Sequence, residues 1–428
     1  MERLDRGSFR LPAFTLSSGV AKKRLVGLTL MAVILGLFFA FNRFPKLDTV
    51  QGDLDVVSGA VVECFQGFCI ERAPDTSFVA RWVDFSVTYL QLVTVGMTFA
   101  FLMAGLAEAF LFPPGSRLWS GGGVLGRTLK GAALGPLMNL CSACIVPVSS
   151  ALRRSGAGIE GTIALVQGSS TMNIPALSMS ALIFAPLLGG SRVVMSVVGA
   201  LAIGPAVAWI ARRGHEGAAE EASEAAQELQ NMVMGEDLAQ PWGEAMREGF
   251  REFARSSVTY FFRLGPIMAA AGFASGLVIQ FIDPDRVGTF VGNDFGGVLI
   301  AATLGILINV PLMFEIPLVA LLLLLGMGVA PAAALLFAAA AGGPVTFWGL
   351  SRIMPMRAMA GFISLTWLVA VAGGLVVLVV ALSVPSLDWG FRPTDDAAEY
   401  RAAERTDGPL WQALEEQALE DQGPVTGE

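Results

Sequence analysis

Two cysteines spaced three residues apart, Cys141 and Cys144, lie inside a long apolar segment. On a helix or in a tight turn this spacing places both thiols on one side, so that both can reach one soft, thiophilic ligand. The same spacing fits a redox dithiol. Two thiols without a neighbouring histidine are too few for a closed zinc site, so we expect no metal site. The alternative is two small buried residues that help the chain pack at a break.

A single carboxylate, Glu315, lies in a second apolar stretch, 304–317, which echoes 134–147 in its prolines. Placing a carboxylate at mid-membrane costs about 2.5–3.5 kcal/mol. Each surrounding Leu, Ile or Val offsets that cost by about 0.3–0.6 kcal/mol, so the segment can still insert. We expect Glu315 to couple transport to protons or to attract cations. The alternative is a structural acid bonded to backbone freed at Pro311 and Pro317.

Side-chain amides form a third group of candidates. Asn139 and Asn309 occupy matching positions in the two apolar stretches, and Asn173 and Gln167 lie in another segment that is unusually polar for a membrane span. In lipid these groups must bond to protein or water, so they line a cavity or form hydrogen bonds between helices. The Gly342-Gly343-Pro344 sequence marks the partner break of Asn173-Ile174-Pro175.

Four further residues have a local interpretation. Cys64 and Cys69 lie in a polar loop, where they form a disulfide if the loop is periplasmic and remain free thiols otherwise. Glu108 and Arg192 lie near segment ends, where we expect interfacial anchoring or ion pairing.

Composition places the chain in a membrane. Hydrophobic residues make up 54% of the 428 residues and charged residues 15%, and the mean hydropathy is +0.63. A soluble chain would carry about 25% charged residues. Repeated apolar runs of about 20 residues predict an all-α polytopic membrane protein. The net charge of −8 says little about partners, because the acids gather in the tails and linker. No basic stripe is present, so we expect no nucleic-acid partner.

Catalytic chemistry has little support in the sequence. The single histidine, His215, lies in a charged linker, which argues against histidine-based catalysis and histidine metal sites. No GxxxxGK[ST] sequence is present, so ATP does not drive the protein directly. We therefore expect no enzymatic activity and no cofactor.

The chain divides into two similar halves with additional segments. The 212–255 linker spaces apolar residues on one helical face from Trp242 to Phe253, which predicts a helix lying on the membrane surface or packed on a neighbour. A signal peptide is disfavoured, because no small-x-small cleavage site follows the first apolar run. The expected parts are a cytoplasmic N-terminal tail (1–24), an anchor span (25–44), a periplasmic loop (45–81), a first repeat (82–211), the cytoplasmic linker (212–255), a second repeat (256–383) and a polar C-terminal tail (384–428).

A repeat becomes visible when the halves are aligned so that Gly135 lies over Gly305. Eleven of 34 positions between Ala132 and Leu165 are then identical, and they include Gly156 with Gly326. If 131–152 is a re-entrant hairpin, about 18 basic residues fall inside and 9 outside, as the positive-inside rule requires. Each half then crosses the membrane an odd number of times, so the sequence predicts two inverted repeats with paired broken or re-entrant helices.

The order of motifs resembles a known family. Cys141-Ser-Ala-Cys144-Ile-Val-Pro147, the following Ala151-Leu-Arg-Arg-Ser-Gly156 and the Asn173-Ile-Pro175 break resemble the predicted-permease family that includes the organoarsenical efflux permeases. The resemblance covers about 82–383. Members often read Cys-Ser-Cys, whereas here the second cysteine comes one place later and Ile174 separates Asn from Pro.

The resemblance implies a multi-pass permease of the bacterial inner membrane, which in some members exports trivalent organoarsenicals through cysteine thiols. We expect ion-coupled alternating-access export of a small solute, with a thiophilic solute as one candidate. Its partners would be membrane lipids, the solute, and a protein bound through 212–255 or the C-terminal tail. A membrane thiol-redox protein and a non-transporting accessory subunit are the alternatives.

Overall fold

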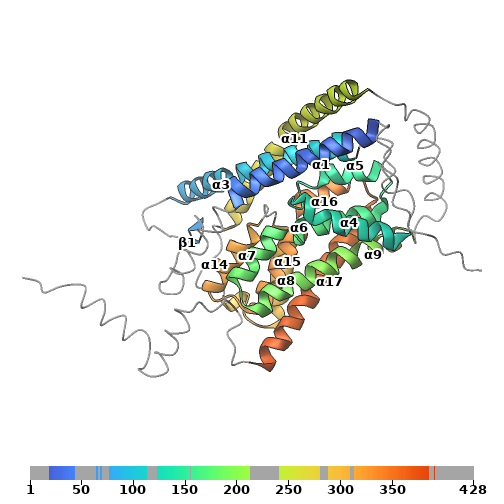
Figure 1. Ribbon diagram of the computed structural model, residues 1–428. Coiled ribbons are helices and arrows are strands. Elements are labelled where there is room, and N and C mark those ends of the chain that lie inside the picture. The colour runs from blue at the N-terminus through green and yellow to red at the C-terminus, as the bar shows by residue number, and fades with distance from the viewer. Residues whose placement is uncertain are drawn as a thin grey trace, which may run out of the picture.

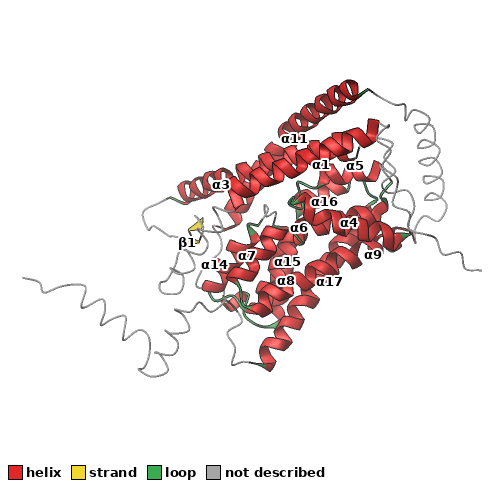
Figure 2. Ribbon diagram, viewed as in Figure 1, coloured by secondary structure: helices red, strands yellow, loops and turns green. Residues whose placement is uncertain are grey.

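The computed structural model describes residues 19–43, 64–65, 68–69, 77–112, 123–154, 156–212, 241–279, 288–308, 313–384 and 390. These residues are almost entirely helical, with a single short strand pair (Figure 2). The N-terminal tail, most of the 45–81 loop, residues 213–240, Asn309 and the C-terminal tail lie outside the described residues, so the predictions made for them remain untested.

Three long helices lie together along one side of the molecule (Figure 1). They are α1 (Gly19–Phe38), which continues as η1 (Phe39–Arg43), α3 (Phe78–Leu106), which continues as η2 (Ala107–Leu111), and α11 (Trp242–Ile279). Helix α11 packs against α3, and the indole nitrogen of Trp82 donates to the carbonyl of Phe273 at 2.8 Å. Each of α3 and α11 precedes one of the two similar halves.

The predicted boundary between linker and second half, at residue 255, falls inside α11. The segment continues as one helix of 38 residues, because Ser256 and Ser257 do not break a helix and no proline precedes Pro266. Its apolar face packs on η2, where Phe250 lies edge-on to Phe110 with ring centroids 5.3 Å apart. Of the two arrangements predicted for this segment, the structure shows the helix packed on a neighbour.

The body of the protein contains two successions of short helices. The first comprises α4 (Val124–Met138), α5 (Val146–Arg154), α6 (Gly158–Thr171), α7 (Ile174–Ile183), α8 (Pro186–Val198), η4 (Gly199–Ile203) and α9 (Gly204–Arg212). The second comprises α13 (Phe295–Leu307), α14 (Glu315–Leu324), α15 (Val329–Ala341), α16 (Pro344–Leu350) and α17 (Met356–Ser383). The helices end at the predicted breaks, between α4 and α5, α6 and α7, α13 and α14, and α15 and α16.

Backbone hydrogen bonds recur at aligned positions of the two halves. After α5, Gly156 donates to Arg153 and Ala157 to Leu152, and after α14 Gly326 donates to Leu323 and Met327 to Leu322. Both pairs form the helix-ending motif that needs a residue with positive φ, and the two glycines have φ of 90° and 91°. At the later breaks, Met172 donates to Gly168 just as Gly342 donates to Ala338. The two halves therefore share backbone conformation as well as sequence.

Within each half the chain reverses direction at its first break. Helices α4 and α6 run parallel, since Arg127 pairs with Glu160 near their starts and Leu140 bonds Ser169 near their ends. The segment between them must therefore lead back toward the start of α4. In the second half, α13 and α15 are also parallel, because Asn293 accepts from Ala330 and Gly305 lies against Ala338.

Helices α6 and α15 start at opposite ends of the body. Helices α8, η4 and α9 form one continuous rod over 186–212. Gly204, in the last third of this rod, lies against the carbonyl of Glu160, which is close to the start of α6. Gly374, far along α17, lies against the carbonyl of Ala330, at the start of α15. The α17 helix runs antiparallel to the rod, with Gly361 beside Ile210. Helices α6 and α15 therefore point in opposite directions.

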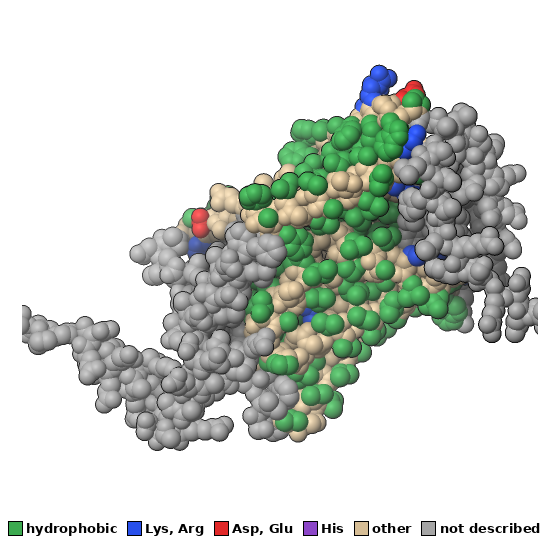
Figure 3. All heavy atoms as spheres, in the orientation of Figure 1, with side chains coloured by type: hydrophobic (Ala, Val, Ile, Leu, Met, Phe, Trp, Pro, Cys, Tyr) green, Lys and Arg blue, Asp and Glu red, His purple; other side chains and the backbone are tan. Residues whose placement is uncertain are grey.

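Five helices among the described residues are long and apolar enough to cross a membrane, by length and composition: 19–41, 94–111, 186–212, 329–350 and 356–383. On the face shown in Figure 3 most visible side chains are hydrophobic, with few charged groups among them. The chain is a multi-pass helical membrane protein.

The strand pair brings two cysteines of the polar loop into register. Strand β1 (Cys64–Phe65) pairs antiparallel with β2 (Phe68–Cys69), so Cys64 lies opposite Cys69 along the backbone. Their side chains lie outside the described part of the chain, and the disulfide between them remains a prediction.

Candidate functional site

The C-terminal end of α6 connects the breaks of both halves. Ser169 Oγ accepts from the amide of Leu140 and donates to the carbonyl of the same residue, both at 3.0 Å. Gln167 donates from Nε2 to the carbonyl of Ala341 at 3.3 Å, at the break that follows α15. The C-terminal end of α6 therefore contacts both the break after α4 and the break after α15. We call residues 167–173 the α6 junction.

The α6 junction also contacts α8, which carries a buried cation. Ser196 donates from Oγ to the carbonyl of Thr171 at 3.1 Å. Arg192 precedes Ser196 by one helical turn, so it lies on the same face of α8. Arg192 is 1% exposed, so its guanidinium lies inside the body.

Arg192 forms an ion pair with Glu315, the first residue of α14. Arg192 Nη2 donates to Glu315 Oε1 at 2.5 Å, and the two residues are 1% and 2% exposed. The pair joins the two halves across 123 residues of sequence. Glu315 also lies in the first turn of its helix, where the helix dipole favours a negative charge. The prediction that Arg192 pairs is confirmed, but its place is the interior and not the membrane interface.

Several polar atoms around the α6 junction have no hydrogen-bond partner among the described residues. They are Nε and Nη1 of Arg192, Oε1 of Gln167, Nδ2 of Asn173 and both amide atoms of Asn139. Each buried group left in this state costs about 1–3 kcal/mol, and such groups are rare in folded proteins. These atoms are therefore candidates for contact with water, an ion or a polar solute.

The asparagines also explain how the breaks form. Asn139 ends α4 in the left-handed conformation, with φ 50°, which asparagine tolerates better than most residues. Asn173 caps α7, accepting from the amide of Ala176 at 3.2 Å. Each asparagine thus ends or starts a helix and still presents unpaired amide atoms to the interior.

Cys141 and Cys144 lie in the break after α4 and are joined as a disulfide, with Cα atoms 5.1 Å apart. Both are buried, at 6% and 5% exposure. Their spacing on one side of the break agrees with the prediction. The counterpart break in the second half has Pro311 and Phe314 at the aligned positions, so the sulfur chemistry belongs to one half only.

A second charged cluster lies at the start of α6, and the sequence interpretation did not identify it. The carboxylate of Glu160 is 1% exposed, accepts from Arg127 Nε at 2.5 Å and lies 3.8 Å from Arg212 Nη2. Burial lowers the pKa of Arg153, and the nearby Glu160 carboxylate partly offsets that shift. This cluster ties the starts of α4 and α6 to the end of α9. No group of three or more His, Cys, Asp or Glu that could hold a metal occurs in the described ranges.

The family model described as a predicted permease, ArsP_1, matches residues 124–379. The chain belongs to this permease family. The matched region starts at α4 and ends within α17, so it contains all four breaks and the Arg192–Glu315 pair. The resemblance inferred from the cysteine and Asn-Ile-Pro motifs is confirmed at the level of the family.

One curated relative of this permease is the UPF0718 protein YraQ of Escherichia coli (strain K12). It is 25% identical over 287 residues, which cover 65% of this chain and 75% of that protein. No solved structure matches the permease.

Proposed function

We propose that this protein is an ion-coupled permease that exports a small solute from the cytoplasm by alternating access. The observation that carries the proposal is the convergence of the breaks on the α6 junction, with unpaired atoms on Asn139, Gln167, Asn173 and Arg192. Freed backbone and polar side chains at mid-depth are typical of transporter sites. In this proposal the protein binds solute and lipid, carries out no covalent catalysis, and resides in the bacterial inner membrane.

The proposed architecture is two inverted repeats with a re-entrant hairpin in each. Two features support it: parallel α4 and α6 require the chain to turn back between them, and α6 and α15 start at opposite ends. Inversion of this kind gives two access routes to one site, which exchange as one half rocks against the other. Asn309 completes the proposed symmetric set of amides.

Labelling of single cysteines from each side of the membrane tests this topology. We expect Gly243→Cys, at the start of α11, to react from the cytoplasmic side and Ser383→Cys, at the end of α17, from the periplasmic side. Gly243 faces open space and Ser383 is exposed, so neither change disturbs packing. The background carries Cys64→Ser, Cys69→Ser, Cys141→Ser and Cys144→Ser, so that each protein has one cysteine. Labelling of both positions from one side would contradict the inverted arrangement.

Glu315 is the proposed proton carrier. Protonation of its carboxylate removes the negative charge of a buried ion pair and leaves Arg192 with no counter-ion. A cation in that position must find a new partner or move, because the attraction that balanced its desolvation is lost. Proton binding therefore biases the packing of α8 against α14, which joins the two halves.

The two cysteines are the proposed contacts for a thiophilic solute. Cysteine ligates soft ions as the thiolate and not as a disulfide, so the disulfide must be reduced before these two cysteines can bind such a solute. We expect uptake of a thiophilic solute into everted vesicles to require a reductant and to fall at least tenfold in Cys141→Ser and Cys144→Ser. Glu315→Gln is expected to abolish the response to a pH gradient. Unchanged uptake in all three variants would refute the site.

A thiol-redox function is the second candidate, and the Cys141–Cys144 disulfide is the observation that favours it. The two candidate functions differ in whether they require the Glu315 carboxylate. A redox protein would cycle its dithiol in Glu315→Gln as in wild type, whereas a permease would lose coupled uptake. Measuring thiol state and uptake in the same vesicles separates them.

A further inference from the structure

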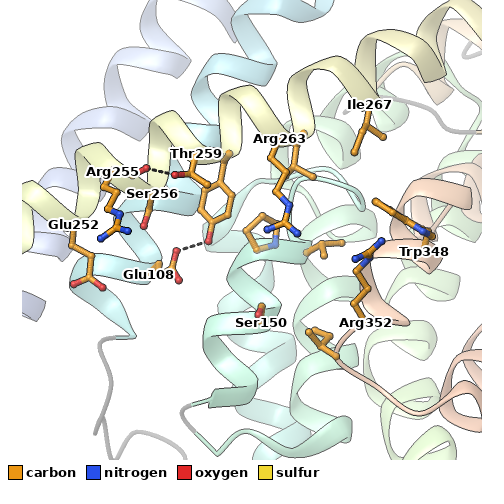
Figure 4. Close-up of a pocket in the computed structure, with 16 residues that line it drawn as sticks. Glu108, Ser150, Glu252, Arg255, Ser256, Thr259, Arg263, Ile267, Trp348 and Arg352 are labelled. Carbon is orange, nitrogen blue, oxygen red and sulfur yellow. Dashed lines mark hydrogen bonds between the residues drawn. The ribbon is translucent and has the colours of Figure 1, made fainter.

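A pocket of about 530 Å³ lies between the two halves, away from the α6 junction (Figure 4). Its walls come from η2, α5, α11 and the end of α16. Pockets that bind small molecules have volumes of about 300–1,000 Å³. Helices α5 and α16 meet beside it, where Gly349 lies against Val146. A ligand here would touch both halves at once.

Two arginines enter this pocket from opposite walls. Arg263 comes from α11 and Arg352 from the turn after α16, and their guanidinium groups point into the same space (Figure 4). Neither has an ion-pair partner among the residues that the structure describes. Arg352 lies over the ring of Trp348, with its guanidinium carbon 4.3 Å from the ring centroid. This stacking orients the guanidinium plane, and the N–H groups at the edge of the plane can still donate to a ligand.

The two acids of the same pocket, Glu108 and Glu252, form no ion pair with Arg263 or Arg352 among the described residues, and a third arginine, Arg255, also lines the pocket. The Tyr260 hydroxyl donates to Glu108, and Glu252 also has an interaction partner. Arg263 lies near the start of the apolar segment of α11, at its boundary with the charged part of the helix.

The remaining wall is apolar. It includes Trp348 and the aliphatic side chains of Val146, Leu264, Ile267 and Ile353. Two guanidinium groups beside an apolar surface fit a ligand that has a carboxylate or phosphate head group and a hydrophobic body.

We propose that this pocket is a binding site for an amphipathic organic anion, held by Arg263 and Arg352 and packed against Trp348. The anionic head can belong to a free solute or to an anionic lipid. The inference does not depend on the transport proposal, because it concerns equilibrium binding and none of its residues lies at the α6 junction.

The test uses the full-length protein in phosphatidylcholine nanodiscs, titrated calorimetrically with benzoate. A hydrogen bond to a charged group contributes about 1.5–3 kcal/mol, and 1.4 kcal/mol is a tenfold change in affinity. We therefore expect Arg263→Gln and Arg352→Gln each to weaken benzoate binding about tenfold or more. Arg251→Gln on the same helix and Arg357→Gln after the same turn are the matched controls, because neither residue lines the pocket.

Nanodiscs with added phosphatidylglycerol distinguish the two sources of the anion. If the lipid head occupies the pocket, phosphatidylglycerol lowers the benzoate affinity of the wild type and has no such effect on the pocket variants. If the pocket takes a free solute, benzoate affinity is the same in both membranes. Either result supports the site, provided that neutral benzamide binds at least tenfold more weakly than benzoate.

Arg263→Lys and Arg352→Lys show whether the glutamine variants lose binding merely because they fail to fold. Both lysine variants keep the positive charge, so we expect their benzoate affinity to lie between those of the wild type and the glutamine variants. Equal binding in the pocket variants and controls would overturn the proposal. So would absence of benzoate binding in both membranes, or equal binding of benzamide.

Discussion

Arg192→Met is expected to lower the free energy of unfolding by about 3–5 kcal/mol, because it leaves the Glu315 carboxylate buried and without a counter-ion. Glu315→Leu is expected to have an effect of the same size, since the Arg192 guanidinium already has two nitrogen atoms without partners. Unfolding in detergent micelles by sodium dodecyl sulfate, followed by tryptophan fluorescence, measures both. Singly substituted proteins that unfold like wild type would contradict the assignment of a buried pair.

The double variant Arg192→Met/Glu315→Leu separates stability from function. Replacing a buried ion pair by apolar residues of similar volume is often neutral or stabilising, so the double variant should recover the stability of wild type. Coupled uptake should remain absent, because no group is left to carry the proton. A double variant that transports like wild type would show that the pair is structural only.

The Lys23–Glu248 pair is the matched control. Its nitrogen and oxygen are 2.9 Å apart, but the Glu248 side chain is 57% exposed. The Lys23 side chain is 10% exposed, but water reaches the Glu248 carboxylate, so the pair is closer to a surface pair, which contributes about 0–1 kcal/mol. Glu248→Gln should therefore change stability by less than about 1 kcal/mol. The comparison distinguishes the effect of burial from the effect of removing any ion pair.

The sequence predicted the breaks because they depend on local chemistry. Glycines with positive φ, such as Gly156 and Gly326, and prolines that start helices, such as Pro175 and Pro344, produce the same backbone wherever they recur. The matching hydrogen bonds of the two halves follow from these residues and needed no tertiary information.

The partners of the charged residues could not be predicted in the same way. Arg192 and Glu315 lie 123 residues apart, and their pairing depends on how α8 packs against α14. A signal was present, since each is the lone charge in an apolar stretch and such charges tend to pair inside a bundle. The Glu160 cluster could not be predicted for another reason. Its members lie at helix ends, where charged side chains usually face water.

The close contact between α4 and α6 provides the second prediction of large effect. A Cβ atom on Gly135 would lie 2.5 Å from the carbonyl carbon of Gly168 and the amide nitrogen of Ser169. These are backbone atoms that no rotamer change can move, so Gly135→Ala must push the helices apart. Overpacking costs about 1–3 kcal/mol, and the two bonds between Ser169 and Leu140 add about 1 kcal/mol each when lost. We expect a loss of about 3 kcal/mol and no uptake.

Two controls show whether the close approach of the helices is the cause. Gly126→Ala on the same helix faces open space, so stability should stay the same or rise by up to about 1 kcal/mol. In the second half, a Cβ on Gly305 would lie 2.6 Å from the Cβ of Ala338, which is a side-chain atom and can be removed. Gly305→Ala should therefore be destabilising alone and partly rescued by Ala338→Gly. No such rescue exists for Gly135→Ala, because its neighbour Gly168 already lacks a side chain. Failure of the rescue would mean that the added Cβ clashes with the α15 backbone, where the amide nitrogen of Ala339 lies 3.0 Å away, and would contradict the assignment of the loss to the Ala338 side chain.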